Sequence, residues 1–73
     1  MIKPLTELKD GTPGIVAAIR GDAKEVSSLK DLGIHIGAEV KVLQGRKGDS
    51  IMVAVGDTRI GVNFQMAQKI LVH

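Results

Sequence analysis

The sequence predicts a mainly β protein, a small β-barrel of five short strands with one helix inserted after the first strand. The chain has 73 residues, which suits a single domain covering residues 1–73. Its apolar residues are mostly Val, Ile, Leu and Ala, in short runs separated by glycines. Five such strands are too few for a two-layer sandwich. A strongly bent barrel, by contrast, closes its own edges, and its bends explain the many glycines.

The chain begins with a turn and a strand. Leu5 and Leu8 stand three residues apart, directly before a tight bend at Asp10 and Gly11. Residues 14–20 (GIVAAIR) follow; they are rich in β-branched residues and bounded by glycines. This composition predicts the first strand.

A helix is expected next, with a clear start and a clear end. Asp22 and Glu25 have the spacing of a capping box, in which each side chain accepts a hydrogen bond from the other residue's backbone amide. Gly33 ends the helix, because glycine enters the left-handed region at little cost, and Ile34 then packs back on Leu29. One helical face is apolar, and its residues recur every three positions: Ala23, Val26, Leu29 and Leu32.

The second half of the chain predicts four more strands. Gly37 makes a second bend, after which residues 39–42 alternate between polar and apolar. Residues 44–49 (QGRKGD) are expected to form a loop tip, and residues 56–57 (GD) suit a two-residue hairpin turn. A short helical turn at residues 63–67 would place Phe64 in the core. The remaining strands are expected at residues 50–55, 58–62 and 69–72.

Composition argues against several classes of function. There is no cysteine, and Phe64 is the one aromatic residue, so the chain lacks the rings that bind proline-rich peptides or stack on single-stranded nucleic acid. No phosphate-binding glycine motif and no arrangement of a nucleophile beside a base is present. The net charge of +2 comes from dispersed residues, so no nucleic-acid partner is expected. A weaker alternative is a basic barrel that binds nucleic acid through Arg46 and Lys47.

One histidine has the surroundings of a weak metal site. His35 stands four residues after Asp31 and four residues before Glu39. One imidazole with two carboxylates is a borderline ligand set for a labile divalent ion such as ferrous iron. A solvated turn of mixed charge is the other interpretation. We therefore expect no required cofactor, and we keep divalent metal binding as an alternative.

Because the sequence shows no catalytic group, our default interpretation of the chain is a protein-interaction module. The most irregular feature is the helix with the Gly33-to-Gly37 junction that follows it, and a helix between two barrel strands can serve for docking. If Leu29 or Leu32 is buried, the contacts must come from neighbours such as His35. The expected partner-binding residues are Ser28, Leu29, Lys30, Asp31, Leu32, Gly33, Ile34 and Gly37.

Three segments in order resemble the FeoA domain family. They are residues 3–19 (KPLTELKDGTPGIVAAI), 27–43 (SSLKDLGIHIGAEVKVL) and 52–72 (MVAVGDTRIGVNFQMAQKILV). The middle segment is similar to the family's signature, whose residues here are Leu29, Leu32, Gly33, Gly37 and Val40. The chain departs from the family pattern at Ser28, where members often have arginine, at Ile36, where proline is common, and at residues 63–65 (NFQ).

The resemblance implies an SH3-like β-barrel with an inserted helix. It further implies an accessory or regulator of bacterial ferrous iron transport, not an enzyme, which binds the cytoplasmic side of a membrane-embedded iron permease that contains a GTPase domain. A cytoplasmic location also fits the lack of an apolar signal core near Lys3 and Pro4. The same domain occurs at the end of metal-dependent repressors, but a chain that starts at Met1 matches the free-standing protein better. Homo-oligomerisation through exposed strand edges stays open.

Overall fold

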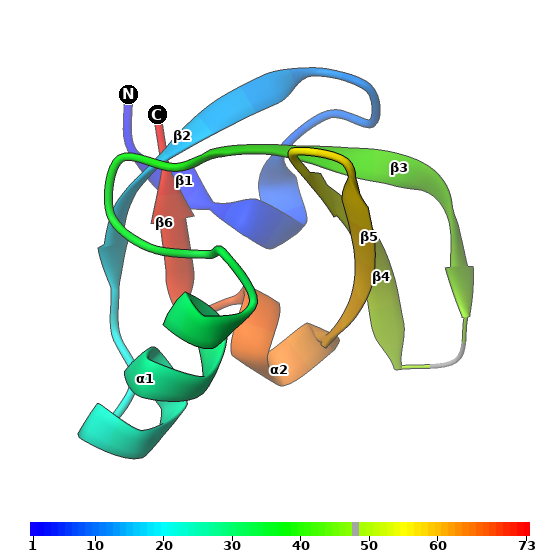
Figure 1. Cartoon of the computed structure of the whole chain (residues 1–73). Helices are drawn as coiled ribbons and strands as arrows, with labels where there is room; N and C mark the ends of the chain where they lie inside the picture. Colours follow the sequence, from blue (N-terminus) through cyan, green and yellow to red (C-terminus); the bar gives the residue numbers. More distant parts are fainter. Residues whose placement is uncertain (48) are drawn as a thin grey trace.

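The protein is built around one strongly bent antiparallel sheet (Figure 1). The computed structural model describes the backbone of residues 1–47 and 49–73, and the side chains of these residues except 44–47. The strands run in the order β1-β6-β2-β3-β4-β5. They are β1 (Lys3–Pro4), β2 (Pro13–Ile19), β3 (Glu39–Lys47), β4 (Ser50–Val55), β5 (Thr58–Asn63) and β6 (Ile70–Val72).

The predicted mainly β class is confirmed, but the described part of the chain has six strands where five were expected. The additional strand is β1, which pairs Lys3 with Val72 and Pro4 with Leu71. Two residues are too few to show an alternating pattern, so the sequence carries no local signal for this strand. The helix therefore follows the second strand, although it still follows the first long one.

β2 is the strand at which the sheet folds over. Its first residues, Pro13 to Ile15, pair with β3, and its last residues pair with β6, with a shift in register between Val16 and Ala18. Gly14 lies at this fold, where a Cβ atom would stand 3.1 Å from Leu8 Cδ2 and 3.3 Å from the Cβ of Val72. Glycine thus permits the close approach that bends the sheet.

The barrel does not pair its two edges, contrary to the expectation. Among the described residues, β5 pairs with β4 alone and β1 with β6 alone, so each has one unpaired side. Helical segments connect the strands: η1 (Leu5–Glu7), α1 (Ala23–Asp31) and α2 (Phe64–Ala67). The core lies between the folded sheet and these segments. Its fully buried large side chains are Leu5, Val16, Ile34, Val40, Val53, Ile70 and Val72.

The two hairpins of the sheet were predicted with unequal success. The tight turn is confirmed, because Val55 pairs with Thr58 across Gly56, whose φ is +59°. The prediction of a loop at residues 44–49 is wrong for residues 44–47, because β3 continues to Lys47. Lys47 pairs with Ser50, and Arg46 pairs with Ile51. Arg46 and Lys47, on which the nucleic-acid alternative rested, thus belong to β3 beside the turn to β4 and not to a loop. Residue 48 lies outside the described residues.

The start of α1 has the predicted capping box. The Glu25 amide donates to Asp22 Oδ1 at 2.8 Å, and the Asp22 amide donates to Glu25 Oε1 at 2.9 Å. The Glu25 carboxylate also forms an ion pair with Lys69, with Nζ and Oε2 3.1 Å apart. Because Lys69 precedes β6 directly, this pair ties the start of the helix to the last strand.

Asp22→Ala is expected to lower the free energy of unfolding by about 1 kcal/mol, because a backbone amide at the helix start loses its acceptor. The melting temperature should fall by roughly 4–8 °C. Ser28→Ala, an exposed change in the middle of the same helix, is the control and should alter stability by less than about 0.5 kcal/mol. Urea and thermal unfolding followed by circular dichroism measure both, and equal effects of the two changes would contradict the role of the cap.

Candidate functional site

The end of α1 is closed by a glycine, as the sequence predicts. Gly33 has a φ of +94°, in the left-handed region. Its amide donates to the Lys30 carbonyl at 2.9 Å, and the Ile34 amide donates to the Leu29 carbonyl at 2.9 Å. These two bonds are the pair that defines a Schellman motif. The helix therefore stops at Asp31, with Leu32 as its C-cap residue.

This ending decides which apolar side chains enter the core. Ile34 is 0% exposed and Leu29 is 5% exposed, so the predicted packing of these two residues in one apolar core is confirmed. Leu32, expected on the apolar face of the helix, is instead 50% exposed, because the chain turns away at Gly33 and Ile34 fills the core. Leu29 and Ile34 thus shape the surface from below and do not face a partner.

The second bend attaches the junction to the sheet. Gly37 has a φ of +93°, and its amide donates to the Val16 carbonyl of β2 at 2.8 Å. The Val16 amide in turn donates to the Ala38 carbonyl at 2.9 Å. Nδ1 of His35 lies within hydrogen-bonding distance, 3.0 Å, of the Ile36 carbonyl oxygen. The segment from Gly33 to Gly37 is thus held at both ends.

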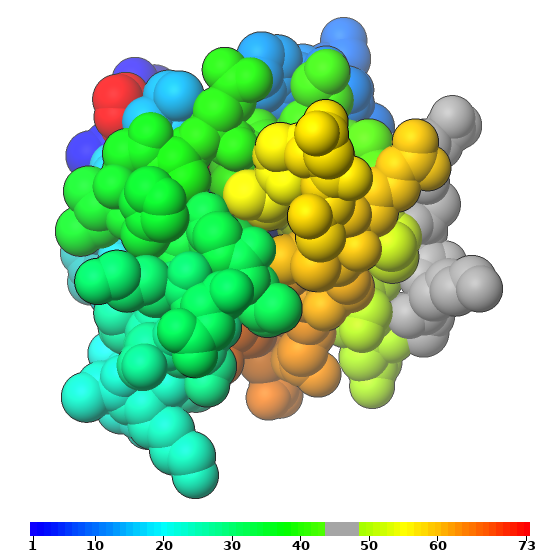
Figure 2. All heavy atoms as spheres, in the orientation of Figure 1, coloured from blue at the N-terminus to red at the C-terminus, as the bar shows by residue number. Residues whose placement is uncertain are grey.

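The exposed side chains of this region form a surface that we call the junction surface: Ser28, Lys30, Asp31, Leu32, His35 and Ile36. Leu32 and Ile36, which is 69% exposed, are two of the four large apolar side chains that are exposed in the described part of the chain. The other two are Met1 and Ile2, at the N-terminus. Figure 2 shows the junction segment, in green, on the same face as β5, in yellow to orange.

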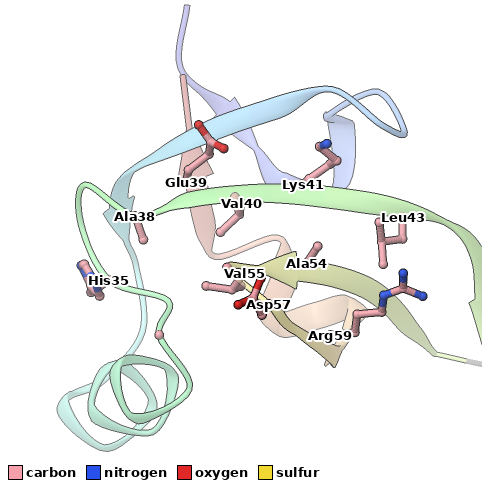
Figure 3. A pocket seen from close by; sticks show the side chains of 12 residues that line it. His35, Ala38, Glu39, Val40, Lys41, Leu43, Ala54, Val55, Asp57 and Arg59 are labelled. Atoms are coloured by element: carbon pink, nitrogen blue, oxygen red, sulfur yellow. The ribbon is translucent and has the colours of Figure 1, made fainter.

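Three hollows border the junction surface. The largest, about 750 Å³, lies between the start of β3 and the β4–β5 hairpin, with an apolar floor at Val40 and charged side chains around it (Figure 3). A second, about 440 Å³, has Ile36 on its wall and is mostly apolar. The third, about 380 Å³, is a groove between α1 and β5 that Leu32 borders. Exposed apolar side chains beside hollows are typical of surfaces that bind other molecules.

The three residues of the metal hypothesis are not brought together. His35 and Glu39 both border the largest hollow, but Asp31 does not. In Figure 3 the His35 ring and the Glu39 carboxylate lie apart along the segment that enters β3. Within residues 1–47 and 49–73, no three His, Asp or Glu side chains form a group that could hold a metal ion. The borderline spacing in the sequence therefore has no matching cluster in space.

Comparison with known families gives a direct result. The sequence-family model of the FeoA domain matches residues 3–73. The chain belongs to the FeoA domain family. No curated protein matches the sequence. The resemblance seen in the three sequence segments is thereby confirmed.

Solved structures of FeoA proteins share the fold. A crystal structure described as an iron uptake regulatory protein, FeoA, is 30% identical, covers 100% of this chain and 96% of its own, and has a TM-score of 0.87. FeoA from Chlorobium tepidum is 32% identical, with coverages of 96% and 68% and a TM-score of 0.86. FeoA from Stenotrophomonas maltophilia, solved in complex with zinc and described as a procaryotic SH3 domain protein, is 25% identical, with coverages of 96% and 88% and a TM-score of 0.80. The expected SH3-like fold is confirmed.

The candidate site predicted from the sequence, the helix and its junction, stays a prediction, and two features of this surface were missed. Ile36 was not among the expected contacts, although an apolar residue in the bend between His35 and Gly37 is a usable signal. The groove between α1 and β5 was also missed, because its walls come from segments that are far apart in the sequence. No local pattern could have predicted that groove.

The two glycines of the junction give a matched test of its geometry. An added Cβ costs about 1–2 kcal/mol in a left-handed conformation, so Gly33→Ala and Gly37→Ala should both lower the free energy of unfolding. At Gly33 the Cβ would also stand 3.2 Å from Cγ1 of Val55, whereas at Gly37 it would meet nothing within 4 Å. Gly33→Ala should therefore be the more destabilising change in urea unfolding. A larger loss for Gly37→Ala would show that contact with β4 does not limit the position of the junction.

Proposed function

We propose that this chain is an accessory protein of bacterial ferrous iron transport. In this proposal it binds the cytoplasmic side of a membrane iron permease that contains a GTPase domain. Its family, and its likeness to a protein described as an iron uptake regulator, support the role in transport. The observation that carries the binding role is the pair of exposed apolar side chains, Leu32 and Ile36, on the junction surface.

The chemistry of the junction surface fits a protein partner better than a reaction. Its two apolar side chains stand among charged and polar ones, a composition that resembles an interaction patch with a polar rim. In the described residues no helix is long and apolar enough to cross a membrane. We therefore propose that the chain acts as an accessory and not as an enzyme, from the cytoplasm, and reaches the membrane by binding the permease.

The mutations that test this role are Leu32→Glu and Ile36→Glu. Each replaces an exposed apolar contact by a charge, so each should weaken binding to the purified permease at least tenfold, which corresponds to about 1.4 kcal/mol. Biolayer interferometry with the permease in detergent measures the affinity with and without guanine nucleotide. Both side chains are exposed, so the melting temperature should change little.

Ile2→Glu is the matched control. Ile2 is also a large exposed apolar residue, but it lies at the N-terminus, outside the junction surface. It should leave the affinity unchanged. Equal losses for Ile2→Glu and Leu32→Glu would indicate general stickiness of apolar residues, and full binding by both junction variants would refute the proposed surface.

Direct binding of a divalent cation is the alternative function. Its support is the zinc complex of the Stenotrophomonas maltophilia relative. In this chain Asp31, His35 and Glu39 form no cluster in the described structure, so we expect no heat in an anaerobic titration with ferrous iron or zinc at tens of micromolar. Heat that disappears in His35→Ala would establish the alternative and would make the chain a metal carrier or sensor.

A further inference from the structure

The outer edge of β5 carries unused hydrogen-bonding groups. In a two-residue hairpin the residues that flank the turn, here Val55 and Thr58, form a hydrogen-bonded pair. Because such pairs alternate along an antiparallel ladder, Ile60 and Val62 bond to β4, whereas Arg59 and Gly61 direct their N–H and C=O groups away from it. Among the described residues no backbone partner is found for these outward groups.

This edge lacks most of the structural features that prevent pairing with another strand. β5 contains no proline, and its register with β4 runs without a bulge from Thr58 to Asn63. At the middle of the edge stands Gly61, which is exposed and brings no side chain over its own backbone. Proteins usually protect such edges with charges, prolines, bulges or covering segments. Here Arg59 is the one charged residue on the strand.

Helix α1 forms the opposite wall of a groove along this edge. The groove holds about 380 Å³ and runs between α1, the second half of β5 and α2. Its apolar lining residues are Leu29, Leu32, Val62 and Met66, of which Leu29 and Val62 are almost fully buried. Figure 1 shows α1 on the side of β5 that faces away from β4, and Figure 2 shows the two segments meeting on one face. An extended chain lying there would reach the β5 backbone on one side and apolar side chains on the other.

Two cations stand near the ends of the groove, and the exposed Asp57 lies in the turn before Arg59. Lys24 borders the groove near the start of α1, and Arg59 stands on the β5 edge beyond the other end. Glu25 also borders the groove, but its carboxylate is held by Lys69 at 3.1 Å. That is the one ion pair found among the described residues, so Lys24 and Arg59 have no carboxylate partner there. Carboxylates on a bound segment would complement both charges.

We propose that this groove binds an extended acidic segment of the partner protein, which pairs with Arg59 and Gly61 as an additional strand of the sheet. An apolar side chain of that segment would occupy the space between Leu32 and Met66, and flanking carboxylates would meet Lys24 and Arg59. The inference rests on the proposed function, and it adds the chemistry and the backbone conformation of the segment that is recognised. Strand addition of this kind takes its affinity from main-chain hydrogen bonds and its specificity from pockets for side chains.

A second copy of the chain is a poorer occupant. Its own β5 edge faces its own α1 across the same groove, so two such edges would each have to pass a helix to meet. It would also bring a second Lys24 and a second Arg59 to a site that already carries these cations. Like charges brought together in an interface oppose association. A segment without a flanking helix and with acidic residues meets neither obstacle.

The test uses the full chain, labelled with ¹⁵N, and short overlapping peptides that cover the cytoplasmic segments of the permease. An acidic peptide should slow hydrogen exchange of the Arg59 and Gly61 amides at least tenfold at saturation. The Ile60 amide, already bonded to β4, should change little and serves as an internal control. The same peptide with its pairing amides N-methylated should lose binding at least tenfold, because it can no longer donate to β5.

Variants of the chain provide a second test of the proposal. Gly61→Pro removes an outward N–H that is not bonded to β4, a change that an edge strand tolerates, and it should abolish the slowed exchange at Arg59. Lys24→Glu should weaken acidic peptides at least tenfold, with Lys9→Glu, an exposed lysine outside the groove, as its control. Leu32→Glu should weaken them as well, whereas Ile36→Glu, which lies outside the groove, should not.

Affinity for the intact permease is measured in parallel, which separates the two proposals. If the permease binds but no peptide protects Gly61, the strand-addition inference is wrong and the proposed function stands. If neither binds, both are wrong. If Gly61 becomes protected without any peptide as the protein concentration rises, and the mass in sedimentation doubles, the occupant is a second copy and the inference is overturned. Peptide binding that N-methylation does not weaken also overturns it.

Discussion

The hydrogen bond from the Ile34 amide to the Leu29 carbonyl, 2.9 Å long, determines the position of everything around the candidate site. It can form only because Gly33 adopts a φ of +94°, which a residue with a Cβ rarely does. Once it forms, Ile34 enters the core and the helix cannot continue. Leu32 is left outside as a consequence, so the exposed apolar residue and the buried one follow from the same bond.

The fold of β2 then fixes this arrangement against the sheet. Val16 pairs with Val72 of β6 and also bonds, through its carbonyl and amide, to Gly37 and Ala38. The same residue thus contacts β6 on one side and holds the junction on the other. At the far end of the helix, Glu25 caps the first turn and pairs with Lys69. Helix α1 is therefore attached at both ends, which keeps its exposed face beside β5.

The features that the sequence predicted well are those that depend on residues adjacent in the chain. The capping box at Asp22, the stop at Gly33 and the turn at Gly56 each depend on a few consecutive residues, and each is confirmed. The features that were missed depend on distant segments. β1 is a strand only because β6 lies beside it, and β3 extends into the first part of the expected loop because β4 pairs with it. For the same reason Leu29 and Leu32, similar in the sequence pattern, differ in burial.

The small size of the domain makes its exposed apolar residues informative. A chain of 73 residues buries a smaller share of its surface than a larger domain, so each apolar side chain left outside the core withholds a contribution to stability. In the described residues the core holds no polar side chain, while Leu32 and Ile36 remain outside it. Single exposed apolar residues are ordinary. Leu32, however, borders a groove whose other wall is an unpaired strand edge. One extended segment can cover the Leu32 side chain and also pair with that edge. This coincidence favours recognition of an extended chain over docking of a folded, convex surface.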